Sequence, residues 1–163
     1  MHYNILKKKQ ILKVGIEEAW DFFSNPQNLA IITPNELNFN VTSEPSEKVY
    51  AGQIITYTVS PMLKIPIKWM TEITNVEPPY KFVDNQLIGP YSLWHHQHHF
   101  KAVPEGTLMT DIVYYSISPF KLGRIADALF VRSQLNKIFD FRYQRIEELF
   151  NTKSSSKQIK KTV

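Results

Sequence analysis

The segments YSLWHHQHHFKAV (91–103) and TLMTDIVYYSIS (107–118), joined by PEG (104–106), indicate the fold class most clearly. Both segments are rich in aromatic and β-branched residues, a composition typical of β-strands. The connection between them is too short for a crossover, which takes a dozen or more residues, so the two strands must pair antiparallel. This part of the chain therefore predicts a β-hairpin within an antiparallel sheet.

Further strand-like runs precede this hairpin, and short turn signals such as Pro78-Pro79 and Gly89-Pro90 separate several of them. Strands joined by short turns usually pair with their neighbours along the chain, which predicts an antiparallel meander. With the hairpin, the sequence predicts seven strands. The five runs before the hairpin are at 3–13, 37–44, 52–60, 64–77 and 80–89.

Two short helices are expected between the first and second strands. In IEEAWDFFSNP (16–26), apolar residues recur at spacings of three and four, which is typical of an amphipathic helix. Pro26 ends this helix, because proline disfavours helical geometry in the residue before it. Residues 27–32 predict a second short helix, which Thr33-Pro34 stops.

One long C-terminal helix of about eight turns is predicted over roughly 121–150. Its apolar face is expected to comprise Leu122, Ile125, Leu129, Phe139, Tyr143, Ile146 and Phe150. We therefore predict an α+β fold in which a seven-stranded sheet curves around this helix and leaves its convex face in water. Such an arrangement encloses a cavity that is suited to a small molecule. We expect residues 1–150 to form a single domain.

Charge and composition narrow the function further. The chain has 19 basic and 15 acidic residues, and the excess equals the four lysines of NTKSSSKQIKKTV (151–163). The body is thus neutral and does not predict a nucleic-acid partner. We interpret 151–163 as a solvated, disordered tail, with a membrane or nucleic-acid anchor as the alternative.

Other protein classes are excluded by what the sequence lacks. The absence of cysteine excludes disulfides, thiolate metal sites and a cysteine nucleophile. No apolar run approaches the roughly 20 residues needed to span a bilayer, so we expect no membrane insertion. The lysine-rich start of the chain lacks the apolar stretch of a signal peptide, and we expect the protein in the cytoplasm.

The order of elements resembles the helix-grip fold of the START-like superfamily, also called SRPBCC, over residues 3–150. The matching segments are closest to a bacterial branch of ligand-binding proteins labelled cyclase/dehydrase-like. They are EEAWDFFSNPQNLAIITP (17–34), WMTEITNVEPPYKFVDNQ (69–86), GPYSLWHHQHHF (89–100) and GTLMTDIVYY (106–115). The resemblance implies a cavity for a lipid, polyketide, hormone or other hydrophobic metabolite, without indicating which.

Strand alternation predicts which side chains line that cavity. In WHHQHHF, we place Trp94 and Phe100 inside, because two large aromatic side chains are costly to expose. His96 and His98 share their face, and the neighbouring His95, Gln97 and His99 face water. The same alternation turns Asp84 inward. The predicted ligand-binding residues are Trp69, Gln86, Trp94, His96, His98 and Asp111.

Several interpretations of the polar residues remain open. His96 and His98 precede the strand that carries Asp111, so they could form an internal His–Asp pair, a ligand-contacting patch or an acid–base pair. They could also chelate a metal ion with Asp111 as third ligand, although we expect neither a metal nor a cofactor. Arg132, near the apolar face of the last helix, is a candidate contact for a ligand carboxylate.

The sequence favours a non-catalytic binder of a hydrophobic or amphipathic small molecule. One alternative is an aromatase/cyclase-like enzyme in which His96 or His98 acts with Asp111. Another is an interaction protein with a vestigial cavity. The oligomeric state is not predicted.

Overall fold

The computed structural model describes residues 3–60, 65–117 and 128–152. The strands are β1 (Asn4–Leu12), β2 (Asn40–Val41), β3 (Ile54–Val59), β4 (Ile67–Glu77), β5 (Lys81–Ile88), β6 (Tyr91–Val103) and β7 (Gly106–Ile117). The helical elements are α1 (Ile16–Phe23), η1 (Pro26–Ile32), η2 (Asn35–Leu37), α2 (Ala128–Ile146) and η3 (Glu147–Asn151). The expected α+β class is confirmed.

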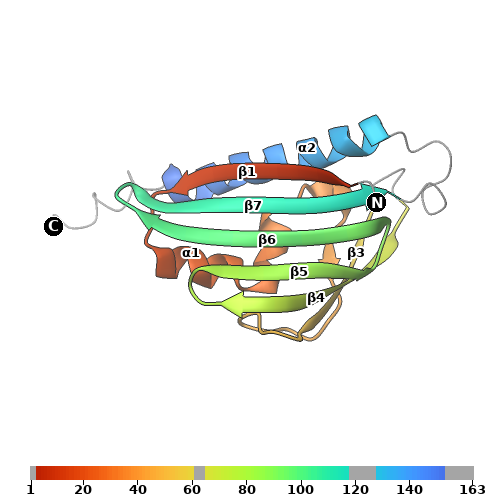
Figure 1. The fold of residues 1–163 in the computed structure, drawn as a ribbon, viewed down its shortest axis with the longest axis horizontal. Helices are drawn as coiled ribbons and strands as arrows, with labels where there is room; N and C mark the ends of the chain where they lie inside the picture. Colours follow the sequence, from red (N-terminus) through yellow and green to blue (C-terminus); the bar gives the residue numbers. More distant parts are fainter. Residues whose placement is uncertain (1–2, 61–64, 118–127, 153–163) are drawn as a thin grey trace.

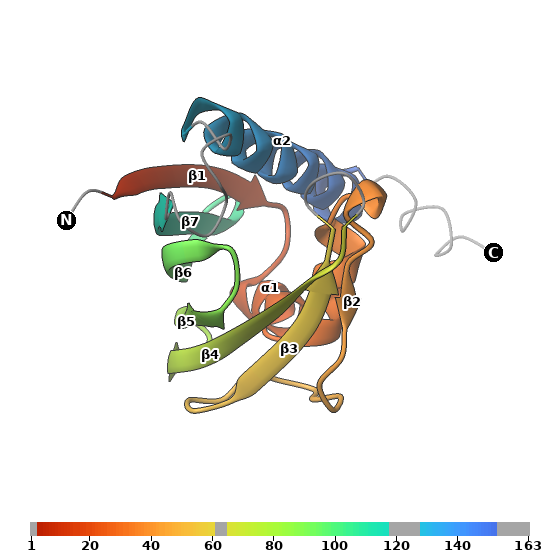
Figure 2. The ribbon, with the colours of Figure 1, turned by 90° about the vertical axis from the view of Figure 1, so that its right-hand side faces the viewer.

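The strands form one antiparallel sheet in the order β1-β7-β6-β5-β4-β3-β2 (Figure 1 and Figure 2). β2 to β7 form the predicted meander, and β1 completes the sheet by pairing with β7 from Asn4↔Tyr115 to Leu12↔Thr107. β2 is much shorter than the predicted strand over 37–44. Residues up to Leu37 form the 3₁₀ turn η2, and Asn38 then adopts a left-handed conformation with φ 46° that an extended strand cannot include.

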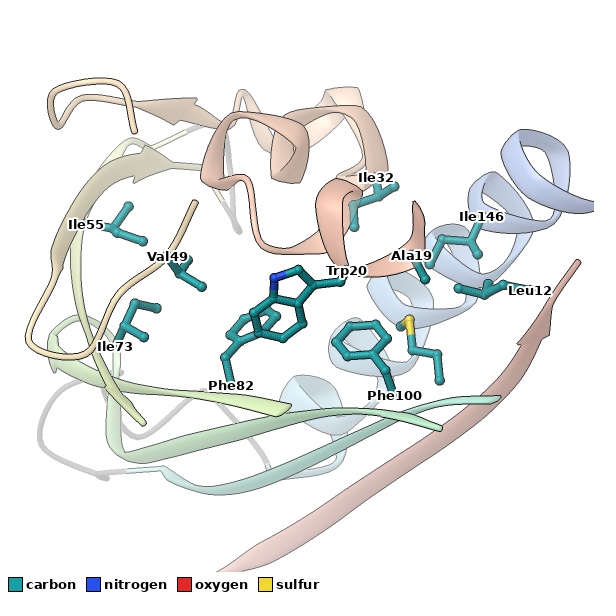
Figure 3. Packing of buried hydrophobic residues seen from close by; sticks show 11 residues of the cluster. Leu12, Ala19, Trp20, Ile32, Val49, Ile55, Ile73, Phe82, Phe100 and Ile146 are labelled. Carbon is teal, nitrogen blue, oxygen red and sulfur yellow. The ribbon is translucent and has the colours of Figure 1, made fainter. Parts of the chain in front are cut away.

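The sheet is strongly curved, and both α1 and α2 lie on its concave side (Figure 2). α1 buries Ala19 and Trp20. The Trp20 ring meets Phe82 and Phe100 edge-on, at centroid distances of 5.9 and 6.0 Å (Figure 3). This aromatic cluster fills the part of the concavity beside α1.

The second short helix is also present, as the 3₁₀ helix η1. The Asn25 side chain accepts a hydrogen bond from the backbone N–H of Gln27 at 2.9 Å, which caps its start. Thr33 ends the helix in an extended conformation, as the following proline requires. η1 thereby covers part of the concave face beside α2.

α2 confirms the C-terminal helix over its described length, while its predicted start at 121–127, with Leu122 and Ile125, lies outside the described residues. Its Val131, Leu135 and Phe139 pack against β1 and β7. The predicted place of Tyr143 on the apolar face is wrong, because this side chain is 44% exposed. The inward position that follows Phe139 is occupied by Arg142, three residues further along the helix.

The helix ends in the single π-helical turn η3, which is tied to the end of β1. Asn151 accepts a hydrogen bond from the backbone N–H of Lys13 at 2.8 Å and donates to the carbonyl of Ile11 at 2.9 Å. Asn151 therefore belongs to the folded part and not, as predicted, to a disordered tail. Residues 153–163 of that tail lie outside the described residues.

None of the helices in the described part of the chain is long and apolar enough to cross a membrane.

Candidate functional site

A cavity with two adjoining lobes lies between the concave face of the sheet, η1 and α2. We name them the polar lobe, of about 130 Å³, which Asp84, His96 and His98 help to line, and the aromatic lobe, of about 140 Å³, which Trp69 and Tyr91 help to line. The lining that the two lobes share comprises Leu29, Phe39, Tyr57, Trp94 and Arg142.

The structure brings four of the six predicted site residues to this cavity. Trp94 lines both lobes, His96 and His98 line the polar lobe, and Trp69 lines the aromatic lobe. Their inward orientation follows from strand alternation, as expected. The other two predicted residues do not line either lobe.

Gln86 and Asp111 have other positions. The Gln86 side chain donates to the Tyr91 carbonyl at 2.8 Å and accepts from the Tyr91 backbone N–H at 3.3 Å, so it holds the β5–β6 turn together. Asp111 is only 2% exposed and lies against the two histidine rings. Strand alternation predicts the face of the sheet on which a side chain lies, but not whether neighbouring side chains then separate it from the cavity.

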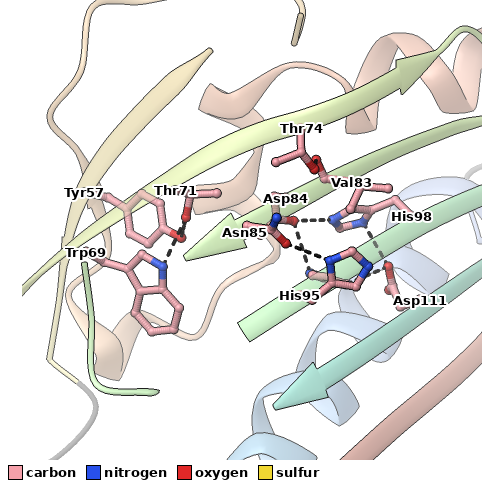
Figure 4. Close-up of polar contacts among 11 residues, drawn as sticks. Tyr57, Trp69, Thr71, Thr74, Val83, Asp84, Asn85, His95, His98 and Asp111 are labelled. Carbon is pink, nitrogen blue, oxygen red and sulfur yellow. Dashed lines mark hydrogen bonds and ion pairs between the residues drawn. The ribbon is translucent and has the colours of Figure 1, made fainter. Parts of the chain in front are cut away.

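The registers of β5, β6 and β7 bring together the four residues that we name the His–Asp quartet: Asp84, His96, His98 and Asp111. Asp84 is directly opposite His96 across β5–β6, and Asp111 is directly opposite His98 across β6–β7. Each histidine also reaches the other carboxylate diagonally. Both imidazole rings thus lie between two aspartates. Figure 4 shows this arrangement for His98, with Asp84 on one side and Asp111 on the other.

The distances within the quartet are short. Asp111 Oδ1 is 3.2 Å from His96 Nε2 and 2.9 Å from His98 Nδ1. Asp84 Oδ2 is 3.1 Å from His98 Nε2 and 3.5 Å from His96 Nδ1. The His96–Asp111 and His98–Asp84 contacts are aligned as hydrogen bonds, whereas His98 Nδ1 has no aligned partner despite its short distance to Asp111.

Burial and pairing shift the pKa values of these groups in opposite directions. Burial alone would raise the pKa of Asp84 and of Asp111, but hydrogen bonds and charge from the histidines outweigh it and hold both pKa values below the usual range. Burial and the neighbouring His98 lower the pKa of His96. For His98, contact with both carboxylates outweighs burial and raises the pKa. Contacts within the quartet therefore favour the ionised form of both carboxylates and the protonated form of His98, whereas burial favours the neutral form of His96.

Arg142 is a cationic side chain of the cavity, and its inward position was not predicted from the sequence. It lines both lobes, and its guanidinium carbon lies 4.8 Å from the centre of the Phe139 ring. Its Nε is buried without a hydrogen-bond partner, and none of the ion pairs among residues 3–60, 65–117 and 128–152 includes it. The expected candidate, Arg132, is exposed. Arg142 lies three residues after the buried Phe139, and this spacing was the sequence signal that Arg142 could face inward.

Aromatic side chains form the wall where the two lobes meet. Trp69 stacks on Tyr57 at a centroid distance of 5.8 Å and meets Trp94 edge-on at 5.3 Å. Thr71 accepts a hydrogen bond from Trp69 Nε1 at 3.1 Å and lies 2.9 Å from the Tyr57 hydroxyl (Figure 4). These polar atoms are paired with one another, so this wall presents mainly ring faces and edges to a ligand.

Chemically, the cavity combines a large apolar surface with Arg142, which both lobes share, and with the histidines and Asp84 of the polar lobe. It can hold an apolar molecule and orient a polar end toward Arg142 or His98. His98 could also transfer a proton if a substrate reached it. In addition, Asp84, His96 and His98 each place one metal-ligating atom within 4.8 Å of the others.

Comparison with known proteins identifies the fold. No protein-family model matches the chain, and no curated protein matches it. Among solved structures, protein CV1439 from Chromobacterium violaceum has a TM-score of 0.69 at 12% identity, covering 90% of this chain and 97% of that one.

Two further similar structures have more informative names. The di-domain ARO/CYC StfQ from the steffimycin biosynthetic pathway has a TM-score of 0.68 at 13% identity, covering 96% of this chain and 52% of StfQ. Ara h 8.0201 has a TM-score of 0.61 at 10% identity, covering 91% of this chain and 97% of that one. These likenesses confirm the predicted START-like helix-grip fold.

Proposed function

We propose that this protein binds a hydrophobic or amphipathic small molecule in the cavity between the sheet and α2, without transforming it. The observation that carries the proposal is the two-lobed cavity, which is walled by aromatic side chains, with Asp84, His96 and His98 in one lobe and Arg142 at both. Apolar contact would supply affinity at roughly 25 cal/mol per Å² buried, and the ionic groups would orient the ligand. The compartment that we propose is the cytoplasm.

The charge of Arg142 supports a ligand with an acidic end. The Nε of Arg142 is unpaired and its guanidinium belongs to none of the ion pairs among the described residues, whereas His98 already contacts two carboxylates. A ligand with an apolar body and an acidic end would pair with Arg142, because guanidinium and carboxylate groups form strong charge-assisted hydrogen bonds. Fatty acids and acidic polyketides have this chemistry.

A cyclase-like enzyme is the second candidate, favoured by His98 lying in the polar lobe between two aspartates. StfQ is named as an ARO/CYC, and its fold is shared. We place catalysis second because His96 and His98 already bond to aspartates, and a general acid or base must also reach the substrate within about 3.2 Å. Loss of water from a polyketide-like test substrate in wild type, but not in His98→Ala, would replace the binding proposal with this one.

A naphthalene probe of the anilinonaphthalene sulfonate type tests binding directly. We expect saturable fluorescence enhancement with one probe per chain, and displacement by a medium-chain fatty acid. Absence of saturable binding would contradict the proposal and favour the third interpretation, a vestigial cavity in an interaction protein.

A further inference from the structure

Each of the two histidines of the quartet directs one ring nitrogen toward the same carboxylate oxygen. His96 Nδ1 and His98 Nε2 are 3.5 and 3.1 Å from Asp84 Oδ2. Three ligands at 2.0–2.2 Å from a tetrahedral ion are separated from one another by about 3.3–3.6 Å. These two distances are close to the ligand spacing of a metal site, and one ligating atom from each of the three residues lies within 4.8 Å of the others.

The opposite ring nitrogens have a matching arrangement. His96 Nε2 and His98 Nδ1 lie 3.2 and 2.9 Å from the same oxygen, Oδ1 of Asp111. Histidines that bind metals almost always direct their other ring nitrogen to a carboxylate, carbonyl or water, which fixes the tautomer and orients the ring. Here a single buried aspartate is positioned to do this for both histidines.

One unsatisfied atom also points to an ion. His98 Nδ1 is buried and has no aligned hydrogen bond. A small rotation of the ring that brings Nε2 onto an ion beside Asp84 would leave Nδ1–H free to donate to Asp111, only 2.9 Å away. A bound ion would thus explain why His98 Nδ1 lies so close to Asp111 without forming an aligned hydrogen bond to it.

We propose that Asp84, His96 and His98 bind one divalent transition-metal ion, with Asp111 as the positioning residue behind both histidines. The polar lobe is lined by all three ligands, so the remaining coordination position faces the cavity. Two imidazoles and one carboxylate suit zinc, cobalt, nickel or ferrous iron better than calcium or magnesium, which prefer oxygen ligands. This proposal revises the expectation of no metal and does not depend on the proposed organic ligand.

A titration of the untagged, chelator-treated full-length protein with Co²⁺ tests the site. We expect one Co²⁺ per chain, with intense visible absorption bands of a four- or five-coordinate ion that added Zn²⁺ abolishes. Asp84→Asn should remove these bands. Asp111→Asn should weaken binding by about 10- to 100-fold, as for other residues that orient metal ligands.

The outer face of β6 supplies a matched control. His95 and His99 lie on the same strand but face away from the cavity, each within 3.0 Å of Gln97. The double variant His95→Ala/His99→Ala should bind Co²⁺ like the wild type. Loss of binding in that variant, or unchanged binding in Asp84→Asn, would overturn the proposal, as would a wild type that takes up no Co²⁺.

A measurement on wild type alone guards against variants that fail to fold. In ¹H–¹⁵N spectra of the histidine rings, Zn²⁺ should shift Nδ1 of His96 and Nε2 of His98, while His95 and His99 stay unchanged. Zn²⁺-induced shifts confined to His95 and His99 would assign the metal to the surface and overturn the proposal. Since no organic ligand is added, failure of this site leaves the probe-binding result untouched.

Discussion

Trp94 contacts both lobes of the cavity and meets the rings of Trp69 and Tyr91 at 5.3 and 4.8 Å. Trp94→Ala should weaken binding of any apolar probe by roughly tenfold or more, since each 1.4 kcal/mol of lost contact is a factor of ten. Probe titration measures this. Tyr80→Ala, which removes an exposed ring outside the cavity, is the control and should bind as wild type does. Equal affinities in all three proteins would remove the cavity as the binding site.

Arg142 should decide between ligands that differ only in their polar end. Arg142→Met keeps an apolar stem of similar length and removes the charge. We expect wild type to prefer dodecanoic acid over dodecanol, and the variant to lose about 10- to 150-fold of that preference, because a hydrogen bond to a charged group contributes about 1.5–3 kcal/mol. Competition against the fluorescent probe measures both affinities.

Arg132→Met is the control for this experiment, since Arg132 lies on the same helix but is exposed. It should keep the wild-type preference. If Arg132→Met lowers the preference and Arg142→Met does not, the acidic end of the ligand is held elsewhere.

At the residue scale, the sequence predicted the inward face of His96 and His98 and their possible pairing with Asp111, which the structure shows. The positions of His96 and His98 follow from the two-residue period of a strand. That Asp84 also pairs with both histidines depends on the register of β5, which no local pattern specifies. Arg142 was missed because after Phe139 a period of 3.6 residues permits either 142 or 143 to face inward.

Among the elements, the β6–β7 turn depends on a glycine. Gly106 has φ +135°, and a Cβ there would collide with the Leu12 carbonyl oxygen. Gly106→Ala should lower the free energy of unfolding by more than about 1–3 kcal/mol, the usual cost of one strained backbone position, because the collision adds to the strain. Gly52→Ala is the matched control: φ is +86°, with open space around it. Urea unfolding of both variants gives the comparison, and equal losses would contradict this account of the turn.

The junction of β1 with η3 depends on Asn151. Asn151→Ala removes hydrogen bonds to Lys13 and Ile11 and should cost about 1–2 kcal/mol, or roughly 2–8 °C in Tm for a chain of this size. Deletion of 153–163 should leave Tm unchanged, because that segment has no apolar pattern. A larger loss from the deletion than from Asn151→Ala would mean that the segment packs on the fold.

The elements themselves were largely predictable, and the exceptions have local causes. Short turns and alternating strands fixed the meander, and proline ended both short helices where expected. β2 has only two residues and begins after Asn38, which takes a left-handed conformation. Asparagine tolerates this conformation, but an alternating strand pattern does not reveal it. The attachment of Asn151 depends on contacts with β1, distant in sequence.

For the whole molecule, the curved sheet leaves a cavity because α1 and its aromatic cluster fill only one end of the concavity. The remaining space is lined mainly by apolar side chains, with Arg142 at both lobes and Asp84, His96 and His98 at the polar lobe. Curvature and helix placement follow from packing of the entire chain, so the sequence could predict that a cavity exists but not its two lobes or how the polar groups are divided between them.

Native mass spectrometry of wild type and Trp94→Ala, each incubated with the same panel of medium-chain fatty acids, tests the central claim that this cavity holds a small apolar molecule. We predict a one-to-one non-covalent complex in wild type that is depleted in Trp94→Ala and released on denaturation. Wild-type protein that binds none of the fatty acids in the panel, or complexes of equal abundance in wild type and Trp94→Ala, would contradict this claim.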